Sequence, residues 1–237
     1  MNAVETEGLT KRYGDLTALD GLTLEVEEGE LFGLLGPNGA GKSSTIEILT
    51  GQTKPTSGTA RVMGVDPTEN PVEARSRMGV LPEREDPPSF LTPREYFDFV
   101  GDVRGVEIDG KVDEWAERLG FDDKLDAISM DLSRGQKQKV MFAQAFVHEP
   151  ELVFIDEPLT NLDPVVQERV KSFVVDYNEK GNTVFLSTHD ITVAEEICSR
   201  VGIIQNGELV AEKDVDEVKR NGSRLIDEFM EEVEGVA

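Results

Sequence analysis

The chain has 237 residues, enough to bury the core of one large domain, and its 48 acidic side chains outnumber its 24 basic ones. The net charge of −24 is spread along the chain without a basic stripe, which argues against nucleic acid as a partner, because duplex binding depends on Lys and Arg that neutralise phosphates. Such a surface repels itself least when salt screens it, so the composition predicts a salt-rich cytosol.

The remaining composition favours an intracellular chain. Cys198 is the only cysteine, so no intramolecular disulfide can form, and its apolar neighbours predict a buried structural thiol. The N-terminus lacks the basic start and apolar stretch of a signal peptide, and no apolar run approaches the length that spans a membrane. We therefore expect a cytoplasmic protein.

Two groups of strands are predicted in chain order. Apolar segments bordered by glycine indicate a small antiparallel sheet, formed by Val4–Leu9, Leu22–Val26 and Thr59–Val62. Short apolar runs separated by helical stretches are typical of a parallel sheet that helices cover on both faces, and they occur at Leu31–Leu35, Met78–Leu81, Leu152–Ile155, Thr183–Leu186 and Val201–Ile204. The fold class is therefore α/β.

Between the small sheet and the last strands the pattern becomes mainly helical. Apolar residues recur near helical spacing in three stretches, Pro93–Arg104, Lys111–Leu119 and Gly135–Val147. We expect one domain over residues 1–220 with a helical subdomain at about 86–148, followed by a separable acidic tail over 221–237.

The most specific motif fits G-x-x-x-x-G-K-[ST], the loop that wraps backbone N–H groups around the phosphates of a nucleoside triphosphate. It follows a predicted strand and continues into a short helical stretch, as such a loop requires. Lys42 supplies positive charge and the Ser43 hydroxyl is placed to ligate Mg²⁺, whereas the alternative is a glycine-rich turn that caps an ordinary helix. The candidate ATP-binding residues are Gly36, Pro37, Asn38, Gly39, Ala40, Gly41, Lys42, Ser43 and Ser44.

Two further segments are placed to complete such a site. The strand Leu152–Ile155 ends in Asp156 and Glu157, at the edge where open α/β sheets bind ligands. Asp156 would hold Mg²⁺ and Glu157 would accept a proton from the attacking water, unless both simply cap the next helix. Ser133 is typical of an N-cap, and the helix N-terminus behind it can receive an anion, although caps without a ligand are common.

These motifs, in this order and spacing, resemble the ATP-binding cassette family over nearly the whole chain. The resemblance implies a P-loop NTPase (RecA-like) core in which Tyr13 stacks on adenine, where the alternative is a tyrosine packed on the core. It implies that His189 contacts the γ-phosphate. It also implies that Leu159–Asp163, with Asn161 and Asp163, lies at a subunit interface, where the alternative is turn chemistry. The residues implied to close over ATP held by a second chain are Ser133, Gly135 and Gln136.

Two residues depart from the family pattern. Glu83 follows the strand Met78–Leu81 where the family usually has Gln, and because a carboxylate ligates Mg²⁺ more strongly than an amide does, we expect altered metal affinity or switching. Arg134 stands where family members usually have a small Gly. It either places a cation near the γ-phosphate or points into solvent.

The resemblance implies an ATP-hydrolysing subunit that uses ATP and Mg²⁺, dimerises around ATP with an identical or a different ATPase chain, and powers an integral membrane permease. The chain would then lie on the inner face of the cell membrane through its permease. The stretch Arg84–Val100 resembles the region that receives the coupling helices of such partners, although some of its aromatic residues belong to the core. The Leu-Pro-Glu departure and the short tail are similar to export systems, and the acidity is similar to that of halophilic archaeal proteins.

Two other classes compete with a transporter subunit. A soluble ATPase of the same family, acting on DNA or ribosomes in a non-transport complex, predicts coiled-coil insertions, tandem cassettes or basic arms, and none is present in the sequence. An ATP-regulated scaffold without turnover is disfavoured by Glu157 and His189.

Overall fold

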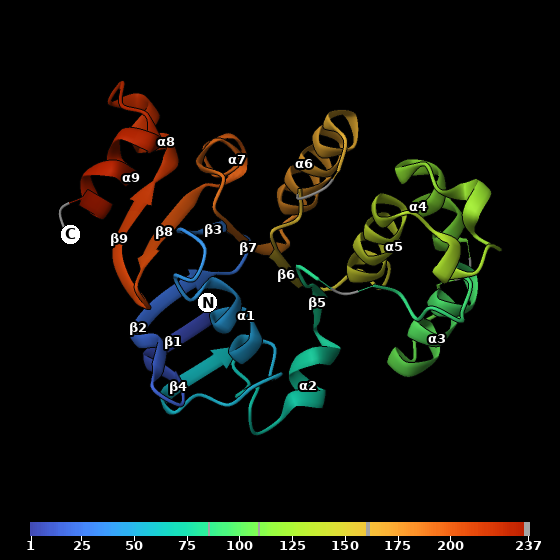
Figure 1. Cartoon of the computed structure of the whole chain (residues 1–237), viewed down its shortest axis with the longest axis horizontal. Helices are drawn as coiled ribbons and strands as arrows, with labels where there is room; N and C mark the ends of the chain where they lie inside the picture. The colour runs from blue at the N-terminus through green and yellow to red at the C-terminus, as the bar shows by residue number, and fades with distance from the viewer. Residues whose placement is uncertain (85, 109, 160–161, 235–237) are drawn as a thin grey trace.

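A computed structural model of the chain describes residues 1–84, 86–108, 110–159 and 162–234. Two sheets and the helices around them form an α/β fold, drawn in Figure 1. In the smaller sheet β1 (Asn2–Tyr13) is central and pairs antiparallel with β2 (Leu16–Glu27) and β4 (Ser57–Val62). The predicted small antiparallel sheet is confirmed, and its strands are longer than their apolar segments because their outer halves are polar and partly exposed.

The larger sheet has the strand order β5-β6-β7-β3-β8-β9. Its strands, in that order, are Met78–Leu81, Leu152–Asp156, Thr183–Thr188, Leu31–Leu35, Arg200–Gln205 and Glu208–Asp214. The first five are parallel, as predicted, and β9 runs antiparallel to β8. β9 is missing from the sequence prediction because this edge strand is charged and has no buried residue, so it lacks the apolar run of a buried strand.

Side chains of the larger sheet alternate between two separate cores. Phe32, Leu34 and Phe154 point to one face, where they pack with the small sheet and α1 (Lys42–Leu49). Leu35 and Ile155 point to the other face, where they join a core to which the helices after residue 92 contribute. This alternation confirms that both faces of the sheet are covered.

The helices occupy the intervals between strands. Their bounds are α1 Lys42–Leu49, α2 Pro71–Ser76, α3 Pro93–Arg104, α4 Lys111–Leu119, α5 Arg134–Phe146, α6 Pro164–Glu179, α7 Ile191–Ile197, α8 Val215–Arg220 and α9 Leu225–Glu234, with 3₁₀ turns at Asp122–Lys124 and Ser129–Asp131. In Figure 1 α3, α4 and α5 form a lobe on the side away from β8 and β9, which agrees with a helical insertion. Within the described ranges, every helix is too short or too polar to cross a membrane.

The residues after Asn221 differ from the predicted separable tail. Leu225 is completely buried in the core that α7 shares, and Phe229 packs against the same core. Lys213 of β9 also pairs with Glu228 at 2.9 Å and with Glu232 at 2.9 Å. Acidic residues dominate the sequence of this segment, which is why a separable tail was predicted. Leu225 and Phe229, one helical turn apart, are enough to anchor α9 on the domain.

Candidate functional site

The phosphate loop, residues 36–41, runs from the carboxyl end of β3 into α1. Gly36 and Gly41 allow a close approach of the neighbouring backbone: a Cβ added to Gly36 would lie 2.3 Å from the Ile204 carbonyl oxygen, and one added to Gly41 would lie 2.5 Å from that of Ala18. Gly41 also has a φ of +111°, which favours glycine. Because no side chain caps α1, the N–H groups of its first turn stay open to an anion.

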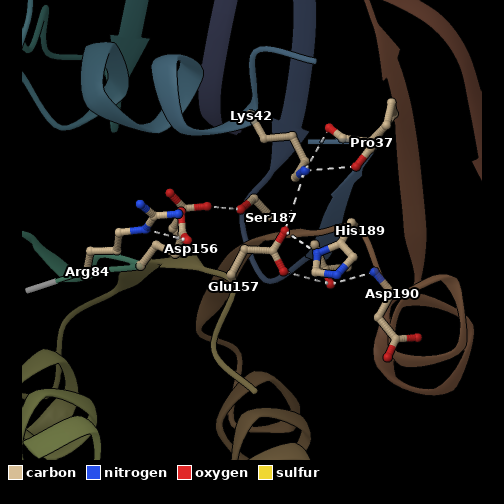
Figure 2. Close-up of polar contacts among 11 residues, drawn as sticks. Pro37, Lys42, Arg84, Asp156, Glu157, Ser187, His189 and Asp190 are labelled. Carbon is tan, nitrogen blue, oxygen red and sulfur yellow. Dashed lines mark hydrogen bonds and ion pairs between the residues drawn. The ribbon is translucent and has the colours of Figure 1, made fainter. Parts of the chain in front are cut away.

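Lys42 is the first residue of α1, and its side chain folds back over the loop. The residue is 5% exposed, and Nζ donates to the carbonyl oxygens of Gly36 at 2.8 Å and Pro37 at 3.2 Å. The same Nζ lies 3.5 Å from Oε1 of Glu157 (Figure 2). The ammonium group is thus held where the loop would enclose phosphates, among acceptors that a phosphate can replace.

Asp156 ends β6 and is buried beside Ser187, its register partner on β7. The Ser187 hydroxyl donates to Oδ1 of Asp156. Burial raises the pKa of Asp156, and the hydrogen bonds from Ser187 and Ser43 oppose that rise. Glu157 and Glu83 add negative charge nearby, so the carboxylate is a strong acceptor in need of a cation.

Glu157 follows in a left-handed backbone conformation, with φ of +51°. Its N–H donates to the Ser187 carbonyl oxygen at 3.1 Å, which fixes the turn. Oε1 lies 2.9 Å from Nδ1 of His189, so the carboxylate stands between His189 and Lys42 (Figure 2). A strained backbone at the end of a buried strand is common where a side chain must be aimed at a ligand.

A cavity of about 510 Å³ connects these residues, a volume that suits a nucleotide-sized ligand. Tyr13, a residue that is 45% exposed, borders it, and the Tyr13 hydroxyl donates to Oε2 of Glu47 at 3.1 Å. Burial raises the pKa of Tyr13. The cavity is lined by Tyr13, Leu16, Ala18, Asn38, Gly39, Gly41, Lys42, Ser43, Ser44, Glu83, Arg84, Glu157 and His189.

The three residues predicted from the second nucleotide motif are not part of this cavity. Ser133 is the N-cap of α5, and its side chain and that of Gln136 form a reciprocal capping box. Gly135 lies in the first turn of the same helix. Their contact with a nucleotide held by a second chain stays a prediction, as does the interface role of Asp163, here the N-cap of α6. Asn161 lies outside the described residues.

The donor set can be compared with what Mg²⁺ prefers, which is oxygen from carboxylates, hydroxyls, water and phosphates. Ser43 is close enough to Asp156 to lower the pKa of that carboxyl, and Glu83 is close enough to raise it. No group of three or more His, Cys, Asp or Glu that could hold a metal ion occurs among the described residues. The Ser43 hydroxyl and the Asp156 and Glu83 carboxylates are hard oxygen donors, so they fit Mg²⁺ only together with further ligands from a nucleotide.

Two residues at the site were given no individual role by the sequence. Ser187 contacts Asp156 only because β6 and β7 are neighbours in register, which a motif does not reveal. Arg84 follows the departure at Glu83 and lines the cavity. By contrast, Cys198 is buried with its pKa raised to about 12 by burial, which confirms the structural thiol.

Comparison with known proteins places this site in a family. A family model described as "ABC transporter" matches residues 19–160. The bacitracin transport ATP-binding protein BcrA of Enterococcus faecalis is 36% identical over 220 residues, covering 92% of this chain and 71% of that protein. The probable multidrug ABC transporter ATP-binding protein YbhF of Escherichia coli K12 is 35% identical over 91% of this chain but 38% of its own length. The methionine import ATP-binding protein MetN of Geobacillus kaustophilus is 36% identical over 94% of this chain and 69% of its own.

Solved structures agree in fold. The structure of an ATP-binding subunit of an ABC transporter superposes with a TM-score of 0.90 at 28% identity, covering 98% of this chain and 99% of that one. A dimeric post-hydrolysis cassette bound to ADP and Pi superposes with a TM-score of 0.81 at 26% identity, covering 90% and 98%.

Proposed function

This chain belongs to the ABC transporter family as an ATP-hydrolysing, nucleotide-binding subunit, and from that premise we propose which of its residues bind and hydrolyse the nucleotide. The observation that carries the proposal is a single cavity shared by the phosphate loop, Tyr13, Glu157 and His189. In it, Tyr13 stacks on the base, residues 36–44 enclose the phosphates, and Lys42 leaves the Gly36 and Pro37 carbonyls for phosphate oxygens.

Glu157 is the proposed general base. Its carboxylate is released when Lys42 turns to the phosphates, and it can then accept a proton from a water molecule aligned with the terminal phosphate. His189, which now contacts Oε1 of Glu157, orients that carboxylate and donates to the γ-phosphate. Mg²⁺, held by Ser43, Asp156 and Glu83, would neutralise negative charge on the phosphates.

The coupling to transport rests on a second chain and a permease. We propose that Ser133, Gly135 and Gln136 of one chain close the nucleotide site of the other, so that ATP favours the closed dimer and hydrolysis returns it to the open state. The permease would dock on the stretch 84–100 and hold the chain at the inner face of the membrane. Export is the proposed direction, supported by the Leu-Pro-Glu departure, and the methionine import relative is the argument for the opposite direction.

The test uses Glu157→Gln, which keeps the shape of the side chain and removes the base. We expect the variant to bind ATP and to hydrolyse it at least about 10²-fold more slowly than the wild type. With ATP bound, the variant should accumulate as a dimer, which size-exclusion chromatography with light scattering detects. Glu151→Gln is the matched control, since Glu151 precedes the same strand with its side chain 62% exposed. Unchanged turnover of Glu157→Gln would remove Glu157 from the mechanism.

A further inference from the structure

Arg84 is a second cation at the nucleotide cavity that the proposed mechanism does not use. It lies two residues after Pro82, just beyond the carboxyl end of β5, and β5 pairs with the strand that ends in Asp156. Among the described residues that line the cavity, Lys42 and Arg84 are the permanently charged cations. Both are therefore placed to meet the phosphates of a bound nucleotide.

The guanidinium group of Arg84 is largely unused. Within the described part of the chain its ion pair is with Glu83, where Nε lies 2.9 Å from Oε1, and the two Nη groups contact no protein acceptor. The Arg84 side chain is 82% exposed and that of Glu83 33%. A pair this exposed contributes about 0–1 kcal/mol to stability, so the arginine can change partner at little cost.

The charge of the cavity favours a change of partner by Arg84 from Glu83 to a phosphate. Glu83, Glu157 and the nearby Asp156 make this end of the cavity acidic, and Lys42 is shared between its own loop and Glu157. A triphosphate entering here needs more positive charge than Lys42 supplies. Arginine offers two parallel N–H donors that match phosphate oxygens, whereas lysine offers a point charge.

The position of Arg84 indicates which phosphate it meets. Arg84 pairs with Glu83, which is close enough to Asp156 to raise the pKa of that carboxyl, so Arg84 lies beside the proposed metal groups. In the view of Figure 2, Arg84 reaches the carboxylates from the side of β5, and His189 approaches Glu157 from the opposite side. The terminal phosphate would lie between them.

We propose that Arg84 binds the terminal phosphate of ATP, and that Glu83 holds it until the nucleotide arrives. The inference rests on the proposed function of the cavity. On binding, the Glu83 carboxylate passes from Arg84 to the metal site, and Arg84 passes to the phosphate that distinguishes ATP from ADP. The exchange makes this arginine a specificity-determining residue of the site.

Equilibrium binding of ATP and of ADP in EDTA tests the contact without hydrolysis and without Mg²⁺. Arg84→Ala is expected to weaken ATP binding about tenfold, about 1.4 kcal/mol, and ADP binding less than about twofold. Arg84→Lys should recover part of the loss. Arg169→Ala, which removes an exposed arginine from α6, is the matched control and should leave both affinities unchanged.

The role of Glu83 is tested in the same assay. Glu83→Gln frees Arg84, so ATP should bind several-fold more tightly in EDTA, and the gain should vanish in Glu83→Gln/Arg84→Ala. Retained ADP binding shows that each variant is folded. An equal loss for ATP and ADP, or ATP binding by Arg84→Ala that matches Arg169→Ala, would overturn the inference. A wild-type chain that binds no ATP would instead overturn the proposed function.

Discussion

The carboxylate of Glu157 stands between two groups that compete for it. Nζ of Lys42 at 3.5 Å and Nδ1 of His189 at 2.9 Å both contact its Oε1, and its side chain is 11% exposed. While Lys42 is engaged, Oε1 of Glu157 is occupied by the ammonium group and water has little access to this largely buried carboxylate. In the proposed mechanism phosphate binding would draw Lys42 out of this pair, and the nucleotide would thereby free the carboxylate that acts as general base.

Asp156 depends on a neighbour that the motif does not contain. Ser187→Ala removes a buried donor to its carboxylate, and loss of such a supporting hydrogen bond typically weakens metal affinity about 10–100-fold. We expect a matching rise in the Mg²⁺ concentration needed for ATPase activity and in the dissociation constant of Mn²⁺ measured with ATP. Ser187→Thr keeps the hydroxyl and should restore both. Ser129→Ala, a fully buried serine in a 3₁₀ turn of the helical lobe, should change neither.

Glu83 is predicted to act on the metal rather than on the fold. Glu83→Ala should raise the Mg²⁺ requirement of ATP hydrolysis by roughly tenfold, about 1.4 kcal/mol, and should uncouple turnover from the permease, because it removes a hard oxygen ligand. Glu83→Gln retains one oxygen and should be mild. A Mg²⁺ titration of Glu83→Ala that superimposes on that of the wild type would count against the metal role.

At the scale of elements, α9 is part of the domain. Leu225→Ala should destabilise the chain by about 2–5 kcal/mol, since it leaves a cavity in a core that the residue fills completely. Met230, on the same helix, is 44% exposed, and Met230→Ala should stay within about 0.5 kcal/mol. Urea unfolding measures both. Equal, small effects would mean that α9 is the separable tail that the sequence suggested.

His148 joins the end of α5 to β5 and gives this contact a pH dependence. Burial lowers the pKa of His148 to about 4, with Arg104 and Lys111 adding to the effect, while Nε2 stays 3.2 Å from the Met78 carbonyl oxygen. In the unfolded chain His148 is protonated below about pH 6.5, whereas in the folded chain it is protonated only below about pH 4. The contribution of neutral His148 to the free energy of unfolding is therefore fully present above pH 6.5 and is lost as the pH is lowered from 6.5 toward 4.

Between pH 7 and 5, His148 should lower the free energy of unfolding by about 2 kcal/mol, beyond what the carboxylates contribute. His148→Gln, which cannot titrate, isolates this part. Urea unfolding of the wild type and of His148→Gln at both pH values gives the difference. Equal losses of unfolding free energy between about pH 7 and 5 in the two chains would show that the His148 imidazole does not cause the pH dependence.

Elements with a clear apolar period could be predicted from the sequence, and those defined by tertiary contacts could not. The predicted bounds of β3, β5, α3 and α4 match the structure. β9 was missed because none of its residues is buried, and α9 because Leu225 and Phe229 and the ion pairs with Lys213 of β9 hold it on the domain without an apolar run. In the site, phosphate-loop and strand-end motifs identify Lys42 and Glu157, whereas the approach of Ser187 to Asp156 depends on strand order.

Over the whole molecule, negative charge exceeds what the basic residues can neutralise, because 48 acids face 24 bases. The ion pairs that do form are mostly exposed, as with Arg94, whose side chain is 41% exposed between Asp113 and Asp126. Such pairs contribute little to stability. The dominant electrostatic effect is therefore repulsion among the unpaired carboxylates, and it grows when two chains approach around ATP.

This repulsion leads to a prediction about salt. Screening shortens the reach of each charge from about 10 Å at 0.1 M to about 3 Å at 1 M, so both the melting temperature and ATP-driven dimerisation of Glu157→Gln should rise from 0.1 M toward molar KCl. If favourable ion pairs dominated instead, the same salt would weaken them and the melting temperature would fall. Thermal melts and light scattering across a KCl series separate the two cases. Sucrose at matched osmolality is the control, because it favours burial without screening charge, and a melting temperature that is flat or falling in KCl would exclude adaptation to a salt-rich cytosol.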